Sequence, residues 1–261
     1  MTATSAPTDS RPAAAPMPPA SAPIPFARLL RVEWGKATDT RSARWLLGIT
    51  ALATALLMLV PLIDRQGNDQ TFAAYLQFAA FGIGTLLPVV SILTLTTEWT
   101  QRTVLTTFVQ VPRRSRVISA KVVVSVLIAF AAIAYGVVVT TVALSIAAAT
   151  GRDVGLGLGA ADLVGYALFV LVNIGMGVAF GALLHNTAAA VVLFYVLPTA
   201  FGILGDAVAP VGRWLDTNTT FNWLVEGDFG GHVPNILVSV LVWLVVPLAL
   251  GLVRTARREI T

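Results

Sequence analysis

Apolar residues occur in long runs along the chain, and short polar or charged segments separate these runs. A helix needs about 20 mostly apolar residues to cross a bilayer. The longest uncharged run, at 163–205, is too long for one crossing, and the polar sequence His185-Asn186-Thr187 divides it into two spans joined by a tight turn. The pattern therefore predicts an all-α membrane protein with six transmembrane helices, at about 45–63, 73–97, 122–150, 163–183, 188–205 and 235–253.

Composition indicates the same class. The chain is 56% hydrophobic and 11% charged, whereas soluble domains carry about 25% charged residues. It contains no cysteine, which excludes disulfides, thiol chemistry and cysteine-based metal sites. Residues 1–24 are rich in Ala, Pro, Ser and Thr and lack an apolar core. We interpret them as a disordered cytoplasmic tail rather than a signal peptide, and we assign residues 25–261 to one six-span domain.

Basic residues predict the orientation, because Lys and Arg stay on the cytoplasmic side. Of the 17 Lys and Arg residues, only Arg65, Arg152 and Arg213 fall in loops of the opposite side. The other fourteen lie in the tail, before the first span, between spans two and three, and at the C-terminus. We therefore expect a multi-pass protein of the cell (plasma) membrane with both termini cytoplasmic. The net charge of +4 reflects this topology and does not indicate nucleic-acid binding.

The segment 26–44 before the first span has an amphipathic pattern. On a helical wheel Phe26, Leu29, Leu30, Trp34 and Ala37 share one face, which predicts a helix lying in the inner membrane interface. Glu33 falls within this apolar stripe. That position suits a face in contact with protein, but a juxtamembrane anchor whose acid reaches the interface explains it equally well.

The connector between spans two and three, residues 98–121, is charged and long. Glu98 and Arg102 have the i,i+4 spacing and order of a helical ion pair. Trp99 marks the interface, and Pro112 predicts a helix end before a basic turn. An ordinary cytoplasmic loop explains the arginines, but a tight turn needs only a few residues. We therefore predict a short helix here that provides a docking surface.

The loop between spans five and six, 206–235, leaves two interpretations open. Its Trp214, Leu215, Phe221, Trp223 and Leu224 can form short helices at the outer interface. An aromatic belt around a loose loop accounts for them as well.

Several kinds of chemistry have no sequence support. No GxxxxGK[ST] motif occurs, so no phosphate-binding loop of that type is encoded. By the predicted topology His185 and His232 lie at opposite membrane faces, too far apart for shared catalysis, and we expect no metal site. No Asp, Glu, Lys or Arg falls within a predicted span, whereas ion-coupled carriers usually place such residues there. We therefore expect that the chain is not an enzyme and that any energy it uses is supplied by a component outside the bilayer.

Taken in order, the motifs of the chain resemble those of the permease subunits of ATP-binding-cassette type-2 exporters, particularly actinobacterial ones. The resemblance covers about residues 26–254, and it departs from the family at His185-Asn186, where basic residues are more usual. It rests on Glu33-Trp34-Gly35-Lys36, Glu98-Trp99, Thr103, Thr106, Pro112-Arg113-Arg114, Ala120-Lys121 and LLHNTAAAVV at 183–192.

This resemblance implies a specific assembly. Two permeases, either two copies or a copy and a paralogue, pair with two separate ATPase subunits that bind ATP and Mg, while the permease itself holds no cofactor and meets only these subunits and lipid. The connector becomes a coupling helix, and the segment before span one, with Glu33, Trp34 and Lys36, also rests on the ATPase. The docking residues implied are Glu98, Trp99, Arg102, Thr103, Leu105, Thr106, Phe108, Pro112, Arg113 and Arg114.

Spans two and five line the pathway in such permeases, which makes Phe78, Phe81, Phe194 and Tyr195 the candidate lining residues. The uncharged interior favours an apolar or amphipathic cargo, such as a drug, peptide or lipid. A membrane assembly or signalling subunit that uses the same connector to bind a cytoplasmic partner is the alternative function.

Overall fold

The computed structural model describes residues 24–64, 69–101, 114–155, 157 and 159–257, so the predicted tail lies almost entirely outside it. Six helical segments in the described part are long and apolar enough to cross a membrane, which confirms the six-span, all-α prediction. Spans two to five are single helices: α4 (Phe72–Thr100), α6 (Arg114–Ala149), α7 (Ala160–Leu184) and α8 (Thr187–Ala207).

The first and last spans are each built from consecutive helical pieces. The first comprises α2 (Arg41–Leu57) and α3 (Leu59–Ile63), and the last comprises α11 (Val233–Val240), a π-helical turn at Leu241–Val245 and α12 (Val246–Arg257). The observed spans agree with the predicted ones to within a few residues, except that the third begins at Ser115 instead of Val122. Lys121 therefore lies inside a long helix.

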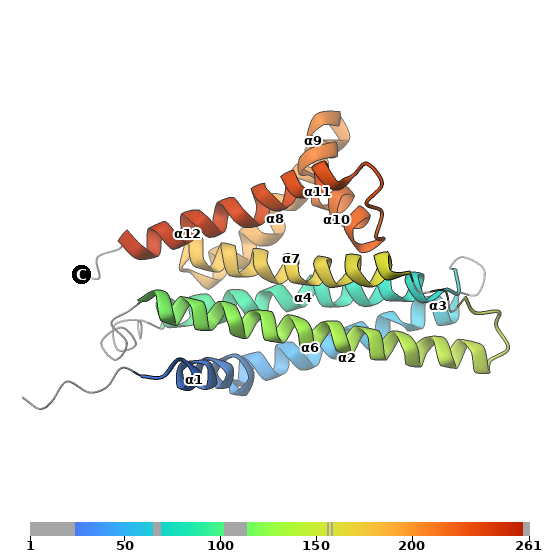
Figure 1. The fold of residues 1–261 in the computed structure, drawn as a ribbon, viewed down its shortest axis with the longest axis horizontal. Helices are drawn as coiled ribbons and strands as arrows, with labels where there is room; N and C mark the ends of the chain where they lie inside the picture. Colours follow the sequence, from blue (N-terminus) through green and yellow to red (C-terminus); the bar gives the residue numbers. More distant parts are fainter. Residues whose placement is uncertain (1–23, 65–68, 102–113, 156, 158, 258–261) are drawn as a thin grey trace, which may run out of the picture.

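The helices form one bundle in which α4 and α7 lie at the centre (Figure 1). α2 and α6 contact this central pair on one side, while α8 and α12 contact α7 on the other. The start of α1 (Phe26–Asp39) and the end of α12 lie at the same end of the bundle in Figure 1. An even number of crossings requires this arrangement.

Glycine allows α4 and α7 to approach closely. A Cβ atom at Gly177 would lie 2.5 Å from the carbonyl oxygen of Pro88, and one at Gly181 would lie 3.0 Å from Leu95 Cβ. The Ser91 hydroxyl of α4 lies 3.1 Å from the carbonyl oxygen of Ile174 in α7. Small residues at these positions therefore let the two central helices pack closely.

Helix α1 is separate from the first span, so the prediction of one helix over 26–44 is wrong at its end. Thr40 has extended backbone angles, and its side chain accepts a hydrogen bond from Ala43 N as the N-cap of α2. Phe26 and Trp34 of the predicted apolar face do not pack against protein and are exposed on its surface. The buried residues of α1 are Leu29, Glu33 and Ala37, because the face that contacts protein is centred on the charged Glu33.

The turn between spans four and five is confirmed. α7 ends where His185 adopts a left-handed conformation with φ of 52°. Asn186 then caps α8, and its side-chain oxygen accepts a hydrogen bond from Ala189 N at 3.0 Å. Asn is a preferred N-cap because its short side chain satisfies a free backbone N–H.

Short helices occupy the loop between spans five and six, which decides between the two interpretations of that loop. They are α9 (Ala209–Leu215) and α10 (Thr217–Val225). Asp216 caps α10 and accepts hydrogen bonds from the backbone N–H groups of Asn218 and Thr219. Phe221 and Leu224 are buried, so α10 packs into the bundle.

Candidate functional site

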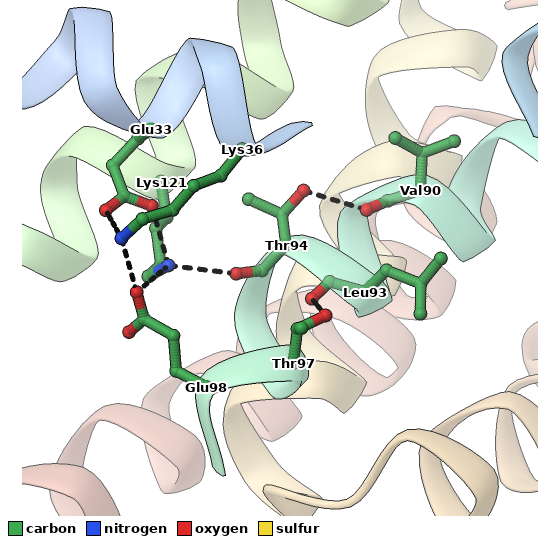
Figure 2. A network of polar contacts seen from close by, with 8 residues as sticks. All are labelled: Glu33, Lys36, Val90, Leu93, Thr94, Thr97, Glu98 and Lys121. Atoms are coloured by element: carbon green, nitrogen blue, oxygen red, sulfur yellow. Dashed lines mark hydrogen bonds and ion pairs between the residues drawn. The ribbon is translucent and has the colours of Figure 1, made fainter. Parts of the chain in front are cut away.

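Four charged side chains from three helices meet at the end of the bundle where the described chain begins and ends (Figures 1 and 2). Glu33 and Lys36 come from α1, Glu98 comes from the last turn of α4, and Lys121 comes from α6. Lys121 Nζ lies 2.6 Å from Glu33 Oε2 and 3.4 Å from Glu98 Oε1. Lys36 Nζ lies 2.8 Å from Glu33 Oε1 and 2.6 Å from Glu98 Oε1. We call these four residues the charged cluster.

The cluster is electrically balanced and largely closed to solvent. It pairs two carboxylates with two ammonium groups, and the Glu33 and Lys121 side chains are 0% and 5% exposed. Removing a charge from water is so unfavourable that buried charges occur almost only in pairs. Lys36 is the most accessible member, at 42%. Burial alone would lower the pKa of Lys36, but hydrogen bonds to Glu33 and Glu98 outweigh burial and raise this pKa above its ordinary value.

The cluster holds the end of α4 against α1 and the start of α6. Besides its two carboxylate partners, Lys121 donates to the backbone carbonyl of Thr94 at 3.1 Å, as Figure 2 shows. Glu98 bridges both lysines. Glu98 therefore links the last turn of α4 to both lysines of the cluster.

Aromatic and hydroxyl contacts hold the other side of the same turn. The Trp99 ring lies over His185, with ring centroids 4.1 Å apart. His185 Nε2 lies 2.9 Å from Thr255 Oγ1 of α12. The Thr187 hydroxyl at the start of α8 lies 2.7 Å from Thr96 Oγ1 and 3.1 Å from Thr100 Oγ1. The last turn of α4 is thus held by α1, α6, the α7–α8 turn and, through His185, α12.

This turn leads directly into the charged connector. Within the described residues, Glu98 and Trp99 of the predicted docking set are fixed in the bundle, and Arg114 begins α6. Glu33 and Lys36 belong to the charged cluster, whereas Trp34 is exposed beside it. The other predicted docking residues, and with them the predicted coupling helix, lie outside the described residues: Arg102, Thr103, Leu105, Thr106, Phe108, Pro112 and Arg113.

A second site lies between α4, α7, α8 and α10, where a cavity of about 530 Å³ opens. Three of the four predicted pathway residues, Phe81, Phe194 and Tyr195, line this cavity. Phe78 does not line it, because Phe78 points into the core around α4 and packs against buried apolar residues there. The structure thus brings spans two and five together at one cavity.

Sequence reasoning missed two residues that organise these sites. Lys121 was grouped with the basic residues of the connector, although it stands next to a long apolar run. Its pairing with Glu33 was therefore not predicted. Asn173 was overlooked in span four, where it is the only carboxamide between 163 and 183. Among the described residues, no group of three or more His, Asp or Glu side chains is placed to hold a metal ion.

Comparison with known proteins adds no family assignment: no protein-family model and no curated protein matches the chain. The chain is a multi-pass membrane protein, and its described residues include six helical segments able to span a membrane.

Proposed function

We propose that this chain is the transmembrane permease subunit of an ATP-binding-cassette exporter. In this proposal ATP and Mg bind to a separate ATPase subunit, two permease chains form the substrate pathway as a dimer, and the predicted 98–114 helix of the connector docks on the ATPase. The order and spacing of the sequence motifs support the assignment, as does the lack of a phosphate-binding loop in the chain. The cytoplasmic side would be the end of the bundle that carries the charged cluster.

The observation that carries the proposal is the fixation of both helices that flank the connector. Glu98 lies one turn before residues 102–113 of the connector, in α4, and Lys121 lies two turns after them, in α6. The two side chains contact each other, and both contact α1. A connector that only joined two spans would need no such anchoring. Anchored on both sides, it can pass a displacement by a partner to α1, α4 and α6 as one unit.

Such a displacement fits a rigid-body mechanism. Packed helices tilt as units, because interfaces change between discrete arrangements and do not deform continuously. The α4–α7 contact at Gly177 and the α7–α12 contact at Gly251, whose Cβ would lie 2.7 Å from Leu183 N, join the centre of the bundle tightly. ATP-driven closure of the ATPases would then tilt the two permeases between inward-facing and outward-facing states.

The cavity of about 530 Å³ favours transport over the alternative role as an assembly or signalling subunit. Its volume is typical of small-molecule sites, which occupy about 300–1,000 Å³. A docking subunit without cargo would need no cavity of this size between its helices.

Affinity purification of the tagged full-length chain from the membranes of its own organism tests the proposal. We expect an ATPase with a phosphate-binding loop to co-purify in equal amount, and the isolated chain to hydrolyse no ATP. Recovery of the chain without any such ATPase, or with only a partner that lacks this loop, would contradict the proposal.

A further inference from the structure

The large cavity has an uncharged lining. α4, α7, α8 and α10 contribute to it, and none of the lining residues is Asp, Glu, Lys, Arg or His. Asp216 adjoins the lining residue Thr217, but its carboxylate serves as the cap of α10: Oδ1 accepts from Asn218 N at 2.9 Å, and Oδ2 accepts from Thr219 Oγ1 at 2.7 Å. A bound ion would find no opposite charge here, so transferring it from water would be strongly unfavourable.

Asn173 provides a polar group deep in this cavity. Its side chain is nine-tenths buried, and Nδ2 donates to the carbonyl oxygen of Phe169 one turn earlier at 2.9 Å. Within the described residues, Oδ1 accepts no hydrogen bond, although Asn173 lines the cavity. Oδ1 is not among the fully buried side-chain atoms that lack a hydrogen-bond partner, so it faces the open space of the cavity. A ligand that brings an N–H or O–H donor can bond to this oxygen in place of water.

Asn173 also stands near the middle of the bundle's depth. It falls near the centre of α7 (Ala160–Leu184), and an ideal Cβ at Gly84, near the centre of α4 (Phe72–Thr100), would lie 3.9 Å from Asn173 Cγ. The same Cβ would lie 2.7 Å from Phe169 Cε1, so the glycine lets the Phe169 ring pack against α4 beside the carboxamide. Polar groups at this depth of a membrane protein commonly mark a ligand pathway.

Aromatic rings form the apolar walls around this carboxamide. Phe169 and Phe221 meet edge to face with centroids 6.4 Å apart, and Phe194 and Tyr195 do the same at 5.0 Å. The Tyr195 hydroxyl donates to the carbonyl oxygen of Thr85, which joins α8 to α4 across the cavity. Phe81 is 65% exposed and lines the same space. Apolar walls with a few placed polar groups are the usual chemistry of a small-molecule site.

We propose that this cavity binds an uncharged amphipathic molecule, with an aromatic or aliphatic body against the phenylalanines and an N–H or O–H donor directed at Asn173 Oδ1. Asn173 is then a specificity-determining residue of the site. The inference rests on the proposed transport function only in calling this molecule a substrate, since binding itself requires no ATPase.

Two probes that share one skeleton test the ligand class. Phenylnaphthylamine is uncharged and carries one N–H donor, and anilinonaphthalene sulfonate adds a negative charge to the same rings. We expect saturable binding of the uncharged probe to the full-length chain in lipid nanodiscs, measured by its fluorescence against empty nanodiscs. The sulfonate should bind at least about tenfold more weakly, since the uncharged lining cannot compensate its charge.

Variants of the cavity assign the binding to Asn173. Asn173→Leu keeps the side-chain size and should weaken binding of the uncharged probe about fivefold, the loss of one hydrogen bond. Thr199→Trp, which fills the cavity from α8, should abolish saturable binding even if Asn173→Leu folds poorly. Thr141→Val, on the exposed face of α6, is the control and should bind as the wild type does.

Equal binding of the two probes, unchanged binding in Asn173→Leu, or full binding in Thr199→Trp would overturn the inference. Co-purification of an ATPase without probe binding would reject this site and leave the proposed function standing. Probe binding by a chain that has no ATPase partner would support this site and reject the proposed function.

Discussion

Lys121 and Glu33 are 88 positions apart in the chain, yet Lys121 Nζ lies 2.6 Å from Glu33 Oε2 in a site closed to solvent. This ion pair joins α1, which precedes the first span, to the start of the third span. Glu98 contacts the same ammonium group from the end of the second span. The two helices on either side of the connector, α4 and α6, are therefore held to α1 at one point.

Lys121→Met should destabilise the protein strongly. It leaves two carboxylates, one of them fully buried, with Lys36 as their only remaining partner in the cluster. Removing one partner of a buried ion pair costs about 3–5 kcal/mol. We expect a loss of this size in the free energy of unfolding, measured by denaturant titration in detergent micelles.

Two matched variants separate burial from charge. Lys36→Met removes the same charge from a side chain that is 42% exposed, and should cost about 1 kcal/mol or less. Glu33→Leu combined with Lys121→Met keeps the remaining Lys36–Glu98 pair neutral and should recover most of the lost stability. Equal losses for Lys121→Met and Lys36→Met would show that the cluster is not buried as described.

The six spans could be predicted from the sequence, because an uncharged run of membrane length has few alternatives as a structure. The turn at His185-Asn186 was equally readable, since polar residues interrupt a run too long for one crossing. The resemblance of the motifs drew attention to Glu33, Lys36 and Glu98 as a group of interest. The connector residues from Arg102 to Arg113 stay predictions.

The charged cluster itself could not be predicted, because it depends on how α1 packs against other helices. Spacing alone left Glu33 equally suited to a protein contact and to the membrane interface. A helical wheel ranks faces by hydrophobicity, so it grouped Trp34 with Leu29 and Ala37 and could not show which of these residues pack against protein. The pairing of Glu33 with Lys121 turns the face of Leu29, Glu33 and Ala37 toward α6 and leaves Trp34 exposed.

Gly177→Ala should disturb the centre of the bundle. The added Cβ would lie 2.5 Å from the carbonyl oxygen of Pro88 on α4, and overpacking of this kind typically costs about 1–3 kcal/mol. Gly48→Ala is the matched control, because nothing lies within 4 Å of the Cβ position there. It should leave the melting temperature unchanged or raise it slightly, since Ala favours helix over Gly by about 1 kcal/mol. Equal melting temperatures for the two variants would contradict the close α4–α7 contact.

The predicted orientation can be tested by labelling, because the chain has no native cysteine to give a background. Gln101→Cys places a thiol at the exposed end of α4, beside the charged cluster, and Thr150→Cys places one directly after the opposite end of α6. In intact cells a membrane-impermeant maleimide should label the second variant and spare the first. Strong labelling of Gln101→Cys would reverse the assigned sides.

The most direct test of the account asks whether ATP hydrolysis moves the permease through the end of α4. In the purified complex with its ATPase, Thr199→Cys reports on the cavity, and its maleimide labelling rate should change severalfold when ATP and vanadate trap the ATPase. Adding Glu98→Gln, which removes the charge that joins α4 to both lysines, should abolish this change while ATP hydrolysis continues. The control is Asp206→Asn. Asp206 is an exposed acid near the C-terminal end of α8, far along the helix from Thr187, and this variant should keep the ATP-dependent change in labelling rate. A labelling rate that does not change with ATP in the complex, or that changes equally in Glu98→Gln, would contradict coupling through the last turn of α4.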